Sequence, residues 1–230
     1  MKNYVFAAAA ALSMALPSAA SAATQVNLTG YTFANGSRDG VLHLSTSPFD
    51  NALVNIGQFK LTGTAIPSGV ALTLFSYCID LGHGFGVPAV FDIMPLSTLF
   101  TGTKAANLNK LLGNTSASTT DASAAIQMAI WEIANETTVA LTVSSDNFFV
   151  TAGSSSAART LANSYLTSLA TWSVPTSGTA KLLISPGNQT QIFFELAPSV
   201  PEPETWGMLI LGMGAVGTVM RRRKRAYVLA

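Results

Sequence analysis

Charge and cysteine are scarce in this sequence of 230 residues. Charged residues make up 10% of it, and it contains one cysteine and two histidines. A single cysteine excludes a disulfide within the chain. Between positions 23 and 200, nine acidic residues outnumber six basic ones. This stretch therefore lacks the excess of Lys and Arg that binding to a phosphate backbone requires, and we expect no nucleic-acid partner.

The scarcity of histidine limits the metal-binding and catalytic sites that the chain can build. Asp80, His83 and Asp92 come nearest to a ligand set, but they show none of the recognised metal-ligand spacings. A nucleophile system of Cys78, His83 and Asp80 would have to converge within one short loop, and no family signature accompanies it. We therefore expect no metal, no cofactor and no enzymatic turnover.

Long apolar runs are also missing, although a shorter one lies near each end. The first covers residues 4–16 and lies between Lys2 and Pro17, ahead of the small residues Ala20-Ser21-Ala22. This order is typical of a secretory signal peptide with an A-x-A-like cleavage site. The alternative, a membrane anchor, needs about 20 apolar residues in a helix. We predict a signal peptide over residues 1–22.

The second apolar run, residues 206–220, lies between a Pro-Glu-Pro motif and a basic cluster. The motif is Pro201-Glu202-Pro203, and the cluster is Arg221, Arg222, Arg223, Lys224 and Arg225. Basic residues beside an apolar span stay on the cytoplasmic side, which orients the tail with its C-terminus inside. A span of fifteen residues indicates a transient membrane stop, and an ordinary single-span anchor is the alternative.

This order of motif, apolar helix and basic cluster resembles the PEP-CTERM sorting signal, here over residues 199–230. The resemblance implies processing by an exosortase-like membrane transpeptidase, with membrane contact through the C-terminal helix before processing. It also implies a final location in the envelope, on the outer surface or in the extracellular matrix of a Gram-negative bacterium. Residues 23–198 would then form the exported domain.

Strand patterns dominate the first part of that domain. Alternating or β-branched segments, separated by Gly, Asn, Asp and Pro, predict strands within residues 26–31, 40–45, 54–61 and 70–79. After a helical middle, two more strands are predicted over 180–184 and 191–196, joined by a turn at Pro186-Gly187-Asn188.

Helical spacing of apolar residues marks the middle of the domain. It predicts helices over residues 104–112, 121–135 and 155–171, with Gly113 closing the first helix and Asp121 capping the second. Strands, then helices, then a closing hairpin favour an α+β fold, a β-sandwich or barrel with a helical insertion.

Cys78 is an odd cysteine in a chain predicted to be exported, which indicates an intermolecular bridge or a reactive thiol. The alternative is a small buried hydrophobic residue at the end of a strand. Its segment, Ser76-Tyr77-Cys78-Ile79-Asp80, is followed 49 positions later by Gln127 in the helical segment Ile126-Gln127-Met128-Ala129-Ile130-Trp131.

Together these segments resemble the Cys-Gln thioester domain of bacterial surface adhesins. The resemblance implies an internal thioester between Cys78 and Gln127, with Tyr77 and Trp131 in its pocket. Such a bond would capture an amine of a surface protein or matrix component, once per molecule. The alternative function is that of a noncovalent structural or glycan-binding biofilm or matrix protein in which Cys78 is merely packed.

Overall fold

The computed structural model describes residues 24–137, 140–153, 155–197 and 211–213. The predicted signal peptide, the sorting motif and the basic cluster lie outside these ranges. Among the described residues, no helix is long and apolar enough to cross a membrane.

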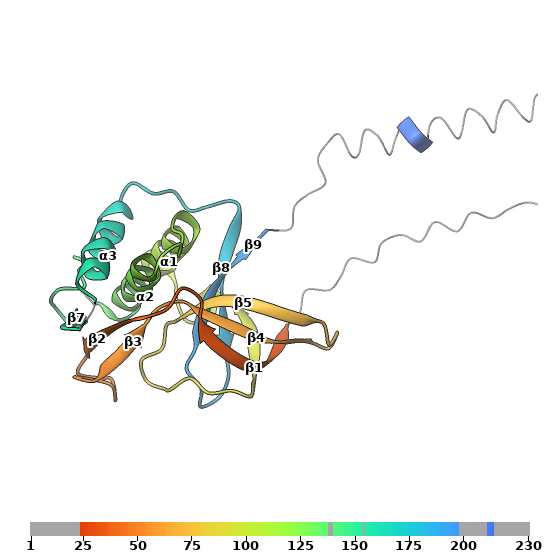
Figure 1. Cartoon of the computed structure of the whole chain (residues 1–230). Coiled ribbons are helices and arrows are strands. Elements are labelled where there is room, and N and C mark those ends of the chain that lie inside the picture. Colours follow the sequence, from red (N-terminus) through yellow and green to blue (C-terminus); the bar gives the residue numbers. More distant parts are fainter. Residues whose placement is uncertain (1–23, 138–139, 154, 198–210, 214–230) are drawn as a thin grey trace, which may run out of the picture.

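Six strands close into an antiparallel barrel, which decides between the sandwich and the barrel expected from the sequence (Figure 1). Their order around the barrel is β1-β4-β5-β9-β8-β6. The strands are β1 (Gln25–Phe33), β4 (Phe59–Ile66), β5 (Ala71–Cys78), β6 (Ala89–Pro95), β8 (Gly178–Ile184) and β9 (Gln191–Leu196). Alternate side chains such as Val26, Leu28 and Leu61 fill the interior and are fully buried.

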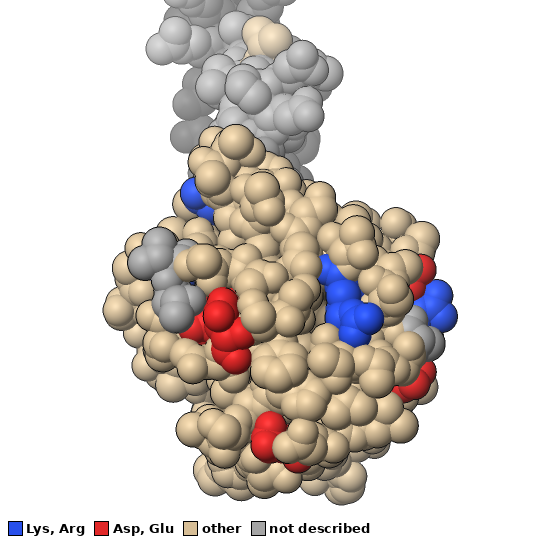
Figure 2. All heavy atoms as spheres, turned by 90° about the vertical axis from the view of Figure 1, so that its left-hand side faces the viewer, with Lys and Arg blue, Asp and Glu red and all other residues tan. Residues whose placement is uncertain are grey.

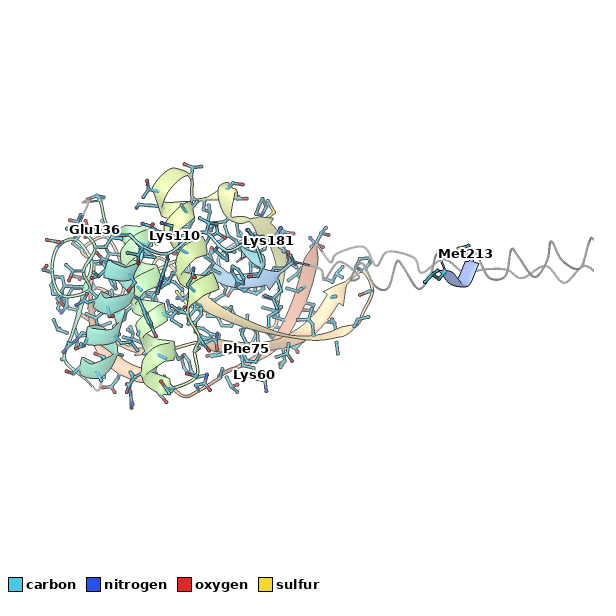
Figure 3. The ribbon with its side chains drawn as sticks, turned by 90° about the horizontal axis from the view of Figure 1, so that it is seen from above. Lys60, Phe75, Lys110, Glu136, Lys181 and Met213 are labelled. Carbon is cyan, nitrogen blue, oxygen red and sulfur yellow. The ribbon has the colours of Figure 1, made fainter. Side chains whose placement is uncertain are left out.

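Three helices lie beside this barrel; two of them contact its strands, and the middle one also contacts a small second sheet. They are α1 (Gly102–Asn114), α2 (Thr120–Asn135) and α3 (Ser156–Ser168), preceded by the short 3-10 helix η1 (Leu96–Thr98). The second sheet has the order β3-β2-β7, with β2 (Arg38–His43), β3 (Leu53–Ile56) and β7 (Phe149–Thr151). Seen from above, the helices lie beside one another at one end of the domain, and the barrel extends from them (Figure 3). The fold is therefore α+β with a helical insertion between β6 and β8.

The central helix is α2, which contacts α1, α3 and β5. Every side chain from Ala122 to Ile133 is buried, including the polar Ser123, Gln127 and Glu132. A helix buried on all sides has no solvated face on which to place polar groups, so each of these needs a partner inside the protein.

The start of α2 differs from the sequence prediction. Thr119, not Asp121, is the N-cap, and its Oγ1 accepts a hydrogen bond from the backbone N–H of Ala122 at 3.1 Å. Asp121 lies in the first turn, where its carboxylate pairs with Arg38 at 2.6 Å. Both residues suit a helix start, but only the extended backbone of Thr119 satisfies the geometry of a cap.

The predicted strand over residues 54–61 is two strands that belong to different sheets. β3 ends at Ile56 and β4 begins at Phe59, with a bend at Gly57 and Gln58. At Gly57, a Cβ atom would lie 2.9 Å from the carbonyl oxygen of Gly36, so glycine is required for the close approach. The backbone N–H of Gln58 leaves the strand pattern to donate to Ser123 Oγ on α2.

Two further details separate the structure from the prediction. Gly113 lies inside α1, which continues to Asn114, and the strands β6 and β7 were not predicted. The closing hairpin of β8 and β9 is confirmed, and Gly187 in its turn has a φ of 72°. Glycine adopts that backbone angle more readily than residues with a Cβ atom, which explains its position there.

Candidate functional site

Cys78 is the last residue of β5 and is 2% exposed. It pairs with Gln191 of β9 at the point where these two barrel strands are in register. Its Sγ donates to the backbone carbonyl of Asp80 at 3.0 Å. The thiol is therefore free, buried and held at the edge of the barrel, directly beneath α2.

Gln127 is the eighth residue of α2 and is 1% exposed. Its side-chain Oε1 accepts from the backbone N–H of Cys78 at 2.9 Å. Its Nε2 donates to the backbone carbonyl of Cys78 at 2.6 Å. The structure thus brings together the two residues that the sequence singled out, through a two-way hydrogen bond between a carboxamide and the backbone of the cysteine.

Burial raises the pKa of the Cys78 thiol well above its ordinary value. The indole N–H of Trp131 opposes this rise, because it lies close enough to stabilise a thiolate. The negative charge of Asp80 adds to the rise, and its backbone hydrogen bond opposes it. The resting sulfur is therefore a protonated thiol with one donor beside it.

Trp131 follows Gln127 by one helical turn and is 4% exposed. Its Nε1 has no hydrogen-bond partner among the residues that the structure describes. A buried N–H without an acceptor costs free energy, so this donor is available to a group that enters the site or to a charge that develops on sulfur.

A cavity of about 270 Å³ opens onto Cys78, Gln127 and Trp131. Aromatic side chains of four other segments complete its wall: Tyr31, Phe33, Phe49, Phe59 and Phe85. The site is thus a buried Cys–Gln pair that lines a mainly aromatic pocket.

Tyr77, the other residue predicted for this pocket, is not brought into it. It is 3% exposed and lines a separate cavity with Leu112 and Ile126. Successive side chains of a strand point to opposite faces, so Tyr77 and its neighbour Cys78 cannot both face the same pocket. Burial raises the pKa of the Tyr77 hydroxyl.

Sequence reasoning missed the aromatic wall of the cavity. Tyr31 and Phe33 lie two positions apart on β1, and Phe33 pairs with Phe59 of β4. Alternation along residues 31–33 was a usable signal that both rings share one face. Phe85 comes from a loop, and only the folded structure places it within 5.1 Å of Tyr31, measured between ring centroids.

Of the polar residues that the sequence analysis set aside, Asp80 and His83 contact each other, and Asp92 pairs elsewhere. His83 Nδ1 lies 2.7 Å from the carboxylate of Asp80. Asp92 accepts from Gln25 instead, at 2.7 Å. In the described ranges, no three His, Cys, Asp or Glu residues gather as a metal site would require.

Charge contributes little to the outer surface near the helices. Figure 2 shows the face formed by the left-hand side of Figure 1, where Lys, Arg, Asp and Glu are few and scattered over a mainly uncharged surface. This face offers no large patch of one sign for electrostatic capture of a partner.

Comparison with protein families identifies the C-terminal segment. Residues 199–224 match the model of the PEP-CTERM protein-sorting motif, so the predicted sorting signal is confirmed. Proteins with this motif are exported and sorted to the cell surface in Gram-negative bacteria, and the motif implies processing by an exosortase. No curated protein matches the chain.

Among solved structures, the domain is similar to the thioester domain of the Staphylococcus aureus TIE protein. The match has 12% sequence identity and a TM-score of 0.42, and it covers 74% of this chain and 78% of the other. A likeness this distant carries no conclusion about chemistry, which must come from the contacts of Cys78 and Gln127.

Proposed function

We propose that this exported domain forms an internal thioester between Cys78 and Gln127 and uses it to attach covalently to an amine on a neighbouring surface or matrix component. The observation that carries the proposal is the two-way hydrogen bond between the Gln127 carboxamide and the Cys78 backbone. It holds the carboxamide beside the residue that carries the only sulfhydryl group of the chain.

The same contacts suit the bond-forming step. The Cys78 sulfur would attack the side-chain carbonyl carbon of Gln127, and the thiol proton would pass to the departing nitrogen, which leaves as ammonia. The Cys78 N–H that now donates to Oε1 would stabilise the oxyanion of the tetrahedral intermediate. An amide is a poor electrophile, so fixed orientation is the main contribution that the fold makes.

Burial then determines how long the product lasts. Because Cys78 and Gln127 are almost inaccessible to water, hydrolysis of a thioester between them would be slow. An entering amine would attack the same carbonyl carbon, form an amide with Gln127 and return its proton to the departing sulfur. Each molecule would react once, so the domain would act as a covalent adhesin or cross-linker and not as an enzyme.

Mass and thiol content test the first step. The wild-type protein should be lighter by one ammonia than its composition requires, and after denaturation without a nucleophile it should not alkylate at Cys78. Cys78→Ala and Gln127→Ala should each restore the mass expected from composition. Gln189→Ala is the matched control, because Gln189 lines the same cavity and should leave the bond intact.

A wild-type protein of full mass with an alkylatable Cys78 would refute the proposal. The remaining interpretation would be a noncovalent structural or glycan-binding matrix protein with a packed cysteine. Burial and the thiol's hydrogen bond to Asp80 are compatible with that role.

A further inference from the structure

The wall of the cavity above Cys78 and Gln127 carries no charge. Among the described residues that line it, none is Asp, Glu, Lys, Arg or His, and the polar groups are uncharged, such as the amides of Asn55 and Gln189. An anionic group brought into this space would lose its hydration without gaining a counter-charge. The chemistry of the wall therefore disfavours ligands that carry a carboxylate or phosphate close to the reacting atom.

Aromatic rings provide the attraction that the missing charges do not. Phe59 contacts three of the other rings. Its ring centroid lies 5.0 Å from that of Phe33, 5.6 Å from that of Tyr31 and 5.4 Å from that of Phe85. Tyr31 also meets Phe85 edge to face, with 86° between the ring planes. Ring faces attract ammonium groups and pack well against methylene chains.

The outermost of these rings is accessible to a ligand. Tyr31 is 46% exposed, whereas Phe59 is 9% exposed. An aromatic surface thus leads from solvent at Tyr31 towards the buried pair. At its inner end lies Nε1 of Trp131, which makes no hydrogen bond among the described residues and lies beside the Cys78 sulfur.

We propose that this aromatic cavity is the acceptor site, and that it selects a primary amine at the end of an unbranched aliphatic chain without a nearby carboxylate. The proposal rests on the proposed thioester. The ammonium would be attracted at Tyr31, lose its proton to water at the mouth, and reach the Gln127 carbonyl carbon along the ring cluster. As the carbon–sulfur bond breaks, the Trp131 N–H would donate to the departing sulfur, which then takes the proton of the amine.

The test compares two nucleophiles on the full-length exported protein. Pentylamine carries the predicted ammonium group and methylene chain. Hydroxylamine is small and neutral near pH 7, so its reaction should not depend on contacts with the aromatic rings. Adduct formation at Gln127 is followed by mass. Tyr31→Leu and Phe85→Leu should slow the pentylamine reaction about three- to tenfold, the size expected for losing one partly exposed cation–π contact. The hydroxylamine reaction should change by less than twofold.

The control for loss of an exposed ring is Phe75→Leu. Phe75 is 51% exposed on β5, pairs with Lys60 and does not line this cavity, so both reactions should be unaffected (Figure 3). Glycine, whose carboxylate lies beside its amine, should react at least tenfold more slowly than pentylamine at equal concentration of free amine.

The possible results distinguish a failure of the acceptor site from a failure of the thioester. If hydroxylamine reacts but neither ring variant slows pentylamine, the acceptor site is refuted and the thioester stands. If glycine reacts as fast as pentylamine, the predicted selectivity is refuted. If wild-type protein gives no adduct with hydroxylamine, the thioester fails and the acceptor site fails with it.

Discussion

Two buried polar side chains on α2, Gln127 and Glu132, are satisfied to different degrees. Gln127 is 1% exposed, and both polar atoms of its amide bond to the Cys78 backbone. Glu132 is fully buried, but only its Oε1 has a hydrogen bond, from the N–H of Thr142 at 2.7 Å. Its Oε2 has no partner within the described part of the chain. A neutral amide is thus fully accommodated on the barrel side of α2, whereas a carboxyl group on the same helix is not.

The difference determines how each site responds to pH. Burial raises the pKa of Glu132 to about 8 from an ordinary value of 4.5, with Glu136 and Asp146 adding to the rise. The Thr142 hydrogen bond opposes it. Gln127 does not titrate, so the contact between α2 and the barrel is independent of pH. At Glu132, by contrast, a rise in pH forces a charge into a buried site, so the stability associated with the protonated carboxyl group is lost.

The largest expected effect comes from removing the Gln127 amide. In a Cys78→Ala background, where no thioester can form, Gln127→Ala should lower the free energy of unfolding by about 3 to 5 kcal/mol. Two buried backbone groups of residue 78 lose their partners and a cavity remains. Urea denaturation measures this, with Gln189→Ala in the same background expected to cost below about 1 kcal/mol. A similar loss of unfolding free energy in both variants would mean that the hydrogen bonds of Gln127 stabilise the fold no more than Gln189 does.

The second effect is the pH dependence from Glu132. The folded state keeps a proton that the unfolded chain releases above pH 4.5, so this contribution is fully present below that pH. It is lost as pH rises, and the loss levels off above about 8. Between pH 5 and 8 the wild type should lose about 2 to 4 kcal/mol more than Glu132→Gln does. Denaturation curves at four pH values would show it. If the free energy of unfolding changed equally with pH in the wild type and in Glu132→Gln, a protonated Glu132 would be contradicted. Glu195→Gln, a substitution on the surface, is the control.

A smaller effect is expected at Asn163 on α3, which holds the same loop as Glu132. Its Oδ1 accepts from the N–H of Val143 at 2.9 Å and from the Thr142 hydroxyl at 3.2 Å. Asn163→Ala should cost about 1 to 2 kcal/mol and speed hydrogen exchange at the Val143 amide. Ser164→Ala, on the exposed side of the same helix, should do neither. Unchanged exchange at Val143 would mean that Asn163 does not hold this part of the loop.

The smallest effect concerns the start of α2, which both buried sites share. Thr119→Ala should cost about 1 kcal/mol because the Ala122 N–H loses its cap, whereas Thr119→Ser should be nearly neutral. Thermal unfolding of the two variants measures the difference. Equal melting temperatures would assign the helix start to the Asp121–Arg38 pair instead.

Sequence patterns predicted the elements of this fold better than their arrangement. The periodicity of α2 and the glycine turn of the closing hairpin are local signals, and both appear in the structure. The division of residues 54–61 between two sheets depends on the Gln58 contact with Ser123, a residue 65 positions away. Local alternation contains no information on such a contact.

The candidate site shows the same limit. Cys78 and Gln127 were paired by resemblance to a family and lie in contact in the structure. The same resemblance implied Tyr77 in their pocket, although strand geometry turns the side chains of adjacent residues to opposite faces. Phe59 and Phe85 were not considered, because rings that converge from separate segments leave no shared signature in the sequence.

The Gln127 carboxamide is held by the main chain of residue 78 and not by its sulfur. The contact with Gln127 therefore does not depend on the side chain at position 78. Alanine or serine at this position would keep both hydrogen bonds and lose only the thiol. A chain with either residue would retain the same architecture while being chemically inert. Possession of this architecture alone is consequently no evidence of reactivity, and the sulfur has to be assayed directly.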